Sequence, residues 1–121
     1  VRNGTTKGID EYALAAYNAP FPDENHKQGV RQFPNLVPGT PRTPSAEPNK
    51  EAWKILREWK KPFLCAFSDK DPIFSGVENS FYKLIPGCKN MPHVTIEDAG
   101  HFLQEDQPEA CVDAILSIKD I

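Results

Sequence analysis

Beyond residue 49 the spacing of the apolar residues changes from helical to continuous. Apolar side chains recur at i, i+3, i+4 and i+7 between Ala52 and Trp59, which predicts an amphipathic helix with Asn49 as its N-cap. Pro62 ends this helix, and residues 63–67 are all apolar. Because a continuous apolar run is typical of a parallel strand covered on both faces, we expect a strand there.

The rest of this region repeats the alternation. A helix is predicted around residues 77–85, a second strand at about 93–97, and a last helix from Pro108, since proline is favoured in the first turn. The order helix, strand, helix, strand, helix predicts a parallel α/β layer. We expect the last helix to bury its apolar side chains, which are Cys111, Val112, Ile115 and Leu116.

A sheet of only two strands leaves a strand that is apolar throughout partly uncovered. Such a sheet leaves an unpaired edge and much exposed apolar surface. We therefore expect further strands, absent from this sequence, to lie beside residues 63–67. The chain is interpreted as the C-terminal piece of a larger protein or as half of an assembly.

The first part of the chain is less regular. Residues 1–8 show no periodicity and are expected to form a loop. Helical spacing predicts one helix that ends before Pro20 and a second, short helix that runs from the N-cap Asp23 through Gln32. Neither helix has enough apolar surface for a core, so both are expected to form a covering layer. Prolines at about every third position of residues 38–48 predict an extended, semi-rigid connector.

Composition and charge exclude several classes of function. The net charge of −3 comes from interspersed acidic and basic residues, so no basic surface for nucleic acid is predicted. No apolar stretch approaches the ~18 residues of a membrane span. The three cysteines form no C-x-x-C pair, and we expect Cys65 and Cys111 to be buried thiols, which favours a reducing, cytoplasmic compartment. The cysteine spacing also predicts no metal site with His26, His93 or His101.

Candidate chemistry comes from the loops that follow the two predicted strands. Parallel strands end at one edge of a sheet, so Asp71 and His101 are expected to lie close together. A carboxylate beside one imidazole nitrogen fixes the tautomer and leaves the other nitrogen as a base. Two alternatives stay open: Asp71 is also a suitable N-cap before Pro72, and His101 is a suitable capping residue of a connecting loop. Asp69 is the competing carboxylate, but its position places it within the turn.

Several motifs extend this interpretation to a family. The S-x-x-D sequence at residues 68–71 and the A-G-H sequence at 99–101 resemble the C-terminal third of the α/β-hydrolase fold, in which the acid and the histidine follow the last strands. A-P-F-P-D at residues 19–23, G-x-R-x-F-P at 29–34 and the stretch 99–106 are similar to haloalkane dehalogenases. The resemblance implies three regions: the end of a helical cap at residues 1–37, a Pro-rich connector at 38–49 and the C-terminal part of an α/β-hydrolase core at 50–121.

The family resemblance also implies a reaction. The complete protein is expected to hydrolyse a carbon–halogen bond of a small halogenated hydrocarbon, with water as the second substrate and halide as a product. Asp71 is then the acid that orients His101, and His101 is the base that activates water to open an alkyl-enzyme ester. No metal and no organic cofactor are implied. The implied lining of an apolar substrate pocket is Phe33, Pro34, Val37, Ile73, Phe74 and Phe102.

Part of the implied machinery is missing from the sequence. There is no nucleophile elbow of the type G-x-[S/D]-x-G, and Trp53 and Trp59 lie on the predicted helix after the connector rather than at a halide site. The family's nucleophile and halide donors would lie before Val1. The 121-residue chain alone is therefore predicted to be inactive.

Two other functions fit the same residues. An epoxide hydrolase shares the acid and the histidine and uses tyrosines of the cap, for which Tyr12 and Tyr17 are candidates, although helical spacing predicts that both face a core. A non-catalytic, truncated interaction module would retain only the acid and the base and would cover its sheet edge with a partner. Product analysis on an epoxide and a bromoalkane separates the first alternative, and size-exclusion behaviour at low concentration tests the second.

Overall fold

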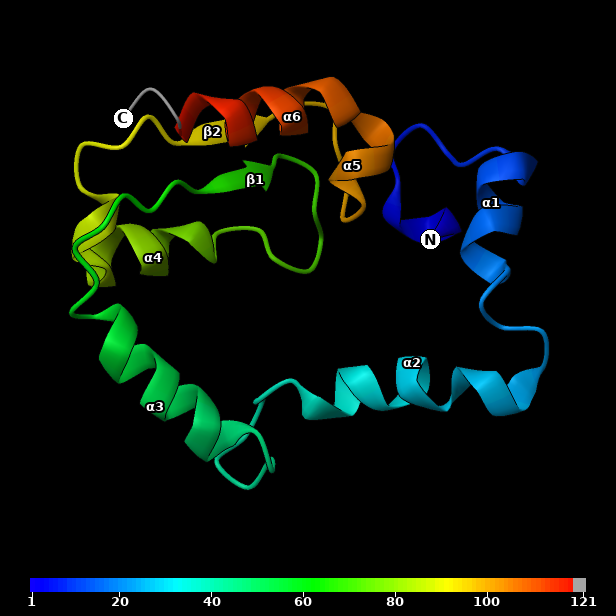
Figure 1. Ribbon diagram of the computed structural model, residues 1–121, viewed down its shortest axis with the longest axis horizontal. Coiled ribbons are helices and arrows are strands. Elements are labelled where there is room, and N and C mark those ends of the chain that lie inside the picture. Colours follow the sequence, from blue (N-terminus) through cyan, green and yellow to red (C-terminus); the bar gives the residue numbers. More distant parts are fainter. Residues whose placement is uncertain (119–121) are drawn as a thin grey trace. The chain divides into compact units, whose positions relative to one another are not determined.

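Residues 1–118 of the chain are described by the computed structural model in Figure 1. Residues 119–121, the end of the predicted core segment, lie outside the described residues. The chain divides into two compact units, one with Val1–Asp10 and Arg57–Ile121 and the other with Glu11–Leu56. The elements, with η for a 3-10 helix, are η1 (Arg2–Gly4), α1 (Glu11–Asn18), η2 (Glu24–Lys27), α2 (Gln28–Gln32), η3 (Phe33–Leu36), α3 (Ala46–Leu56), β1 (Ala66–Ser68), α4 (Glu78–Leu84), η4 (Pro86–Cys88), β2 (Val94–Ile96), α5 (Leu103–Asp106) and α6 (Pro108–Ser117).

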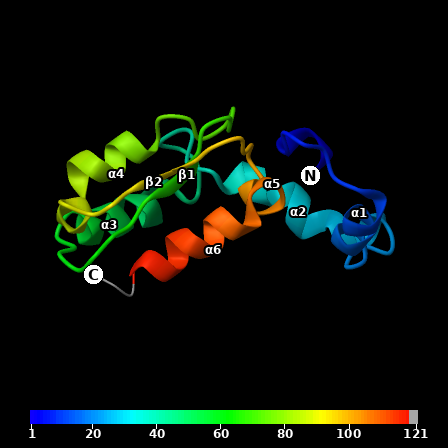
Figure 2. The same ribbon diagram turned by 90° about the horizontal axis from the view of Figure 1, so that it is seen from above.

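Within the described residues, the first unit contains a two-stranded parallel sheet. β1 pairs with β2, with Ala66 opposite Val94 and Ser68 opposite Ile96. Both views show α4 on one face of the strands and α6 on the other (Figures 1 and 2). The predicted mixture of helices and parallel strands is confirmed, and it is compatible with part of an α/β fold.

The helices α4 and α6 pack against the sheet with side chains of different size. On α4, Phe81 lies against the aromatic rings of Phe63 and Phe67, with ring-centroid distances of 6.0 Å to each. On α6, Ala114 joins a buried cluster around the C-terminal end of β2. A small residue at this position lets α6 approach the strands closely. The core of this unit therefore lies at the C-terminal end of β2, where the loop that carries His101 begins.

β1 is shorter than the predicted strand and begins later. It covers Ala66–Ser68 rather than residues 63–67. Phe63 instead donates its N–H to a carbonyl oxygen in η4 (3.0 Å), and Cys65 donates its N–H to Nδ1 of His93 (3.1 Å). Because β2 supplies ladder partners for a short stretch only, the preceding backbone is satisfied by a loop and by a side chain.

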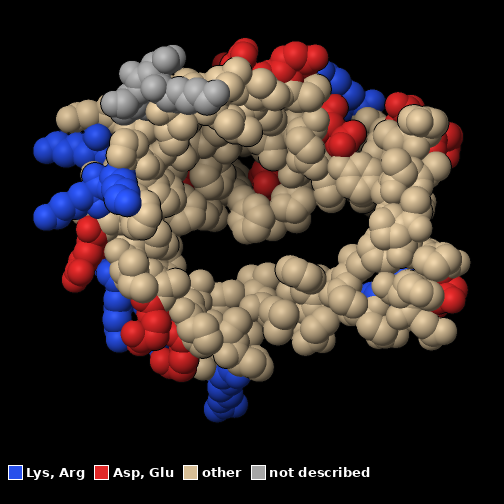
Figure 3. All heavy atoms as spheres, in the orientation of Figure 1, with Lys and Arg blue, Asp and Glu red and all other residues tan. Residues whose placement is uncertain are grey.

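α3 begins earlier than the sequence predicts. It covers Ala46–Leu56, so Asn49 lies inside the helix and is not its N-cap. Pro48 falls in the first turn, where proline is tolerated because the backbone N–H has no intrahelical partner. Acidic and basic side chains share the surface of α3, where Lys50 pairs with Glu47 (Figure 3).

The second unit is formed by short helices. Asp23 caps η2 as predicted, because its carboxylate accepts the backbone N–H groups of Asn25 (2.8 Å) and His26 (3.3 Å). None of α1, α2 and η3 contains a buried residue. The prediction that Tyr12 faces a core is wrong, since this residue is 89% exposed. Tyr17 is half-buried.

The face of α6 that carries its larger side chains is exposed. Contrary to the prediction, Val112, Ile115 and Leu116 are not buried, and Ile115 is 68% exposed. Cys111 is half-buried, and the residue that α6 does bury is Ala114. Burial of the larger side chains needs a covering element that the described residues do not supply.

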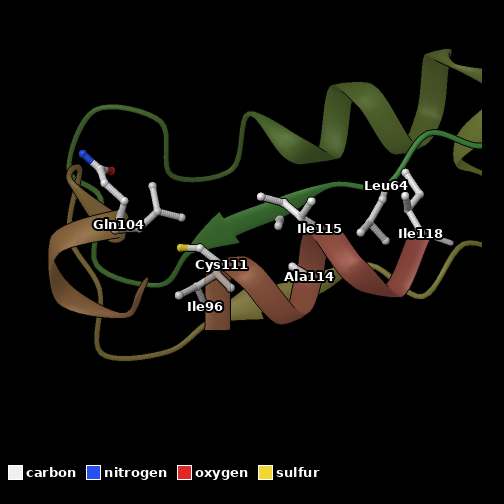
Figure 4. Close-up of a pocket in the computed structure, with 9 residues that line it drawn as sticks. Leu64, Ile96, Gln104, Cys111, Ala114, Ile115 and Ile118 are labelled. Atoms are coloured by element: carbon white, nitrogen blue, oxygen red, sulfur yellow. The ribbon is translucent and has the colours of Figure 1, made fainter. Parts of the chain in front are cut away.

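A hollow of about 430 Å³ lies between α6 and the strands (Figure 4). Leu64 and Ile96 line it from the strand side, and Cys111, Ile115 and Ile118 line it from the helix side. Among residues 1–118, no charged side chain lines this hollow. An apolar surface of this kind suits coverage by another layer of protein rather than acid–base chemistry.

Candidate active site

The loops after β1 and β2 bring Asp71 and His101 together. β1 ends at Ser68 and β2 at Ile96, and because the strands are parallel, both segments leave the sheet at the same edge. Nδ1 of His101 lies 3.0 Å from Oδ2 of Asp71. The two residues whose proximity the sequence predicts are therefore hydrogen-bonded, although they are 30 positions apart in the chain.

Asp71 is held through both of its carboxylate oxygens. Oδ1 accepts the backbone N–H of Ile73 (2.8 Å), and Oδ2 accepts the hydrogen bond from His101. Asp71 is 8% exposed, and burial alone raises the pKa of its carboxyl. The hydrogen bonds from His101 and from the backbone of Ile73 and Phe74 outweigh burial, so the pKa of Asp71 lies below its ordinary value. The carboxylate is ionised at neutral pH.

The ionised carboxylate determines the tautomer of His101. A carboxylate accepts hydrogen bonds and donates none, so the proton of the neutral imidazole is on Nδ1. Nε2 is then the nitrogen with a lone pair, and it can take a proton from a water molecule. Asp71 and His101 thus have the geometry of an orienting acid and a general base.

Apolar side chains surround the imidazole. The ring centroids of Phe74 and His101 are 5.4 Å apart, and Phe102 meets His101 edge-on, also at 5.4 Å. A hollow of about 230 Å³ is lined by Asp71 and His101 together with Phe74 and Leu103. A small, largely apolar hollow whose polar lining residues are Ser68, Asp71 and His101 suits a small substrate that has little hydrogen-bonding capacity.

The predicted substrate-binding residues occupy different places. Phe74 lines the hollow, and Phe102 contacts the imidazole from its edge. Ile73 is 62% exposed, and its contribution is the backbone N–H that it donates to Asp71. The remaining predicted residues belong to the second unit, at η3 and its C-cap, and their place in a pocket stays a prediction: Phe33, Pro34 and Val37.

Four lining residues of the hollow were not predicted as site residues. Ala66, Phe67 and Ser68 form β1, and Leu103 is the first residue of α5. The position of Ser68 at the C-terminal end of a predicted parallel strand is a signal that points to a ligand site. Leu103 carries no such signal, because an apolar residue at a helix start is equally suited to the core.

Asp69, the competing carboxylate, has a different partner. It lies in the turn after β1, as predicted, and its Oδ1 accepts the backbone N–H of Ala99 (3.1 Å). The next residue, Lys70, pairs with Asp98. These contacts connect the two loops beside the Asp71–His101 pair without competing for the imidazole.

A third carboxylate, that of Asp106, contacts the loop that carries His101. This contact was not predicted. Asp106 is 3% exposed and accepts the backbone N–H of Gly100 (2.8 Å). Burial alone raises the pKa of its carboxyl, but the backbone N–H groups of Gly100, Thr6 and Lys7 outweigh burial and hold the pKa below its ordinary value. Thr6 is 100 residues away in the sequence, so no local pattern indicates this contact.

The cysteines and the metal-ligating side chains form no second candidate site among residues 1–118. All three cysteines are free; Cys65, as predicted, and also Cys88 are buried. Burial, with Cys88 nearby, raises the pKa of the Cys65 thiol to about 12, so Cys65 is not a nucleophile at neutral pH. Among residues 1–118, no three His, Cys, Asp or Glu side chains are grouped to bind a metal ion. No helix in that same range combines the length and the apolarity needed to cross a membrane.

Similar sequences occur among curated proteins. The chain is 50% identical over 109 residues to a haloalkane dehalogenase from Psychrobacter cryohalolentis, 41% over 114 residues to one from Mycolicibacterium paratuberculosis, and 39% over 117 residues to one from Mycobacterium marinum. These alignments cover 90%, 94% and 97% of the chain. The chain is homologous to the C-terminal portion of haloalkane dehalogenases. The predicted family resemblance is confirmed.

The haloalkane dehalogenase relatives are longer than this chain. The chain spans 36%, 38% and 39% of their lengths. No family model matches the chain. The homologous portion contains a hydrogen-bonded carboxylate and imidazole beside an apolar hollow, and it corresponds to only part of a dehalogenase.

Proposed function

We propose that the full-length protein that contains this chain is a hydrolase of haloalkanes, with Asp71 as the acid and His101 as the base of a catalytic triad. The observation that carries the proposal is the 3.0 Å hydrogen bond between Oδ2 of Asp71 and Nδ1 of His101, formed where two parallel strands end. The relatives named haloalkane dehalogenase support the substrate class. The nucleophile is an aspartate outside this chain.

The proposed reaction has two steps. In the first, a carboxylate oxygen of the nucleophile attacks the carbon that bears the halogen; a C–O bond forms, the carbon–halogen bond breaks, and the halide leaves with its electron pair. In the second, Nε2 of His101 takes a proton from water while the water oxygen adds to the acyl carbon of the ester. The acyl C–O bond then breaks, and the alkoxide leaves with the proton from His101. The carboxylic acid loses its proton to solvent, which restores the nucleophile.

In this mechanism, His101 acts only in the second step. Halide departure needs no base, because the attacking group is already an anion. Ester hydrolysis does need a base, and Asp71 supports it by keeping the proton on Nδ1 and by stabilising the imidazolium that forms. No metal ion or organic cofactor has a role in either step.

We place the chain in an α/β-hydrolase fold. Residues 50–121 are the C-terminal part of its core, residues 1–37 are the end of its helical cap, and residues 38–49 are the connector. The part of the fold outside this chain covers the apolar face of α6, of which Ile115 is 68% exposed. It also supplies the nucleophile and the halide site, so the 121 residues alone are inactive.

The substrate pocket is proposed to be apolar. Phe74 and Phe102 flank the imidazole, which supports a place beside the reacting carbon. Ile73 and three residues of the second unit complete the proposed lining, and those three are Phe33, Pro34 and Val37. The free thiols of all three cysteines support a reducing compartment, which we propose to be the cytoplasm.

Product analysis on the full-length gene product tests the proposed function. With bromobutane we expect bromide and butanol in equal amounts, and with epoxybutane we expect no diol. Diol formation without bromide release would assign the pair to an epoxide hydrolase instead. The isolated 121-residue chain should release no bromide above a His101→Ala control, because it lacks the nucleophile.

A further inference from the structure

Asp106 has an unusual set of partners for a buried carboxylate. It is 3% exposed, and the backbone N–H groups of three residues donate hydrogen bonds to its carboxylate. Thr6 donates to both oxygens (3.0 and 2.9 Å), Lys7 donates to Oδ1 (3.1 Å), and Gly100 donates to Oδ2 (2.8 Å). The ammonium of Lys7 bonds instead to the main-chain carbonyl of Asp106 (2.7 Å). Asp106 therefore joins two chain segments through their backbone N–H groups.

The two segments that Asp106 joins are the N-terminal segment, residues 4–7, and the histidine loop, residues 98–102. The residues on either side of His101 both form hydrogen bonds that hold this loop. Before it, Gly100 donates its N–H to Asp106; after it, Phe102 donates its N–H to the carbonyl of Gly4 (2.9 Å). The backbone of His101 is thus fixed on both sides, before it by the nearby Asp106 and after it by Gly4, which is remote in sequence.

The N-terminal segment and the histidine loop are also in close contact. A Cβ atom added to Gly100 would lie 2.5 Å from the carbonyl oxygen of Gly4, which is far closer than real Cβ atoms approach. A Cβ atom added to Gly4 would lie 2.5 Å from the ring of Phe102. Only glycine permits this approach at both positions, so there is little room for the histidine loop to shift.

We propose that Asp106 is a positioning residue for His101, which ties the N-terminal segment to the histidine loop and so fixes the imidazole at the position from which it activates water. The inference rests on the proposed function. Asp71 fixes the far end of the side chain through Nδ1, and Asp106 fixes the backbone from which the side chain starts. A displacement of about 1 Å at a reacting group lowers a rate on the order of 10²-fold.

The negative charge of Asp106 is needed for this role. A carboxylate can accept all of these N–H groups at once, whereas an amide must turn an NH₂ donor toward some of them. Asp106→Asn therefore sets donor against donor at Gly100 or, with the amide reversed, at Lys7. The backbone N–H groups keep the carboxylate ionised despite its burial, since they hold the pKa of Asp106 below its ordinary value.

Measuring the two reaction steps separately distinguishes a loss of His101 positioning from a loss of protein stability. Asp106 acts through His101, and His101 acts in ester hydrolysis only. In the full-length protein, we expect Asp106→Asn to form the ester at close to the wild-type rate constant, seen as a burst of one halide per active site. Steady-state kcat then falls on the order of 10²-fold, and KM falls with it, because the ester accumulates. The burst amplitude counts folded sites, so partial unfolding lowers the amplitude and leaves the two rate constants unchanged.

Asp98→Asn is the matched control. It removes a carboxylate from the same loop, but the Asp98 side chain is 70% exposed and pairs with Lys70. The backbone of Asp98 has φ 55°, a conformation that asparagine also adopts readily. Burst and steady-state rates of Asp98→Asn should match those of the wild type.

Gly100→Ala is a second, independent variant. It retains the charge of Asp106 and places a methyl group against the carbonyl of Gly4, which displaces the histidine loop. The same burst with slow hydrolysis is expected. If Asp106→Asn yields no folded protein, Gly100→Ala decides the inference by the same criterion.

The outcomes distinguish this inference from the proposed function. Absence of halide release by the wild-type protein overturns the proposed function, and the inference with it. Wild-type turnover combined with equal slowing of both steps in Asp106→Asn overturns the inference alone, and so does wild-type hydrolysis in that variant. Selective slowing of ester hydrolysis, with the Asp98→Asn control unchanged, supports it.

Discussion

The carboxylate of Asp71 makes two different contacts with its two oxygens. Oδ1 accepts the backbone N–H of Ile73 and so caps the turn that follows, while Oδ2 accepts the proton of the imidazole. The two interpretations of Asp71 from the sequence, a local cap and a partner for His101, therefore describe two halves of one side chain. The local contact fixes the carboxylate in the orientation that the histidine needs.

Asp71→Asn should separate these two contacts. The amide can still cap the turn through its oxygen, but it then points an NH₂ donor at Nδ1 and favours the wrong tautomer of His101. We expect kcat of the full-length protein to fall by about 10³- to 10⁴-fold, as removal of the corresponding charge does in serine proteases. Turnover within tenfold of wild type would contradict the role of Asp71.

Asp71 should also contribute to stability in a pH-dependent way. Its folded-state pKa lies below the ordinary value of 3.8, so its contribution is complete above that value and is lost as the pH falls through the lowered pKa. The difference in thermal midpoint between the wild type and Asp71→Asn should therefore be constant near neutral pH and shrink below pH 3.8. A difference that grows on acidification would contradict this linkage.

The secondary-structure elements show which features are determined locally. The cap at Asp23 and the start of α6 at Pro108 follow from a few neighbouring residues, and the sequence predicts both. The proximity of Asp71 and His101 also follows from the sequence, because parallel strands share an edge. The role of Asp106 could not be predicted in the same way, since two of its partners, Thr6 and Lys7, are remote in the chain.

Boundaries of elements were less predictable for a different reason. β1 begins at Ala66 because its ladder needs a partner strand, and hydrophobicity alone does not say where that partner begins. α3 begins at Ala46 because Pro48 is compatible with a first helical turn, although proline-rich sequence favours extension. Partner geometry and position within a helix decide these boundaries, and neither is visible in the spacing of apolar residues.

The entry of β1 into the sheet depends on the side chain of His93. Its Nδ1 accepts the N–H of Cys65 (3.1 Å), its Nε2 is 3.0 Å from the carbonyl oxygen of Cys88, and its ring lies 4.3 Å from that of Tyr82. His93→Leu keeps the ring's apolar contact in part but leaves both backbone groups without this partner. The loss in unfolding free energy of the full-length protein should be about 2 kcal/mol or more.

The exposed His26 provides the control for this prediction. His26 pairs with Asp23 in the second unit, and both side chains are more than half exposed. His26→Leu should change the unfolding free energy by less than about 0.5 kcal/mol. Equal effects of the two substitutions, measured by denaturant unfolding, would contradict the role of His93.

On the scale of the whole molecule, the apolar face of α6 is the strongest sign of a larger fold. Ile115 is 68% exposed in this chain, and the described residues that line the hollow beside it are all uncharged. If the rest of an α/β-hydrolase fold covers this face, Ile115→Asp should lower the unfolding free energy of the full-length protein by about 2 kcal/mol or more. Asp113→Ala, on the exposed polar side of α6, is the control. Equal stability of Ile115→Asp and wild type would show that this face is not covered.

His101 is proposed to act as a base in ester hydrolysis alone, and replacing its imidazole tests this role. The full-length His101→Gln variant is incubated with bromobutane, and bromide release and intact protein mass are followed together. The variant should release one bromide per protein molecule and become heavier by one butyl group, because the ester forms and cannot be opened. Continued turnover, or neither bromide nor adduct under conditions where the wild type turns over, would contradict this role.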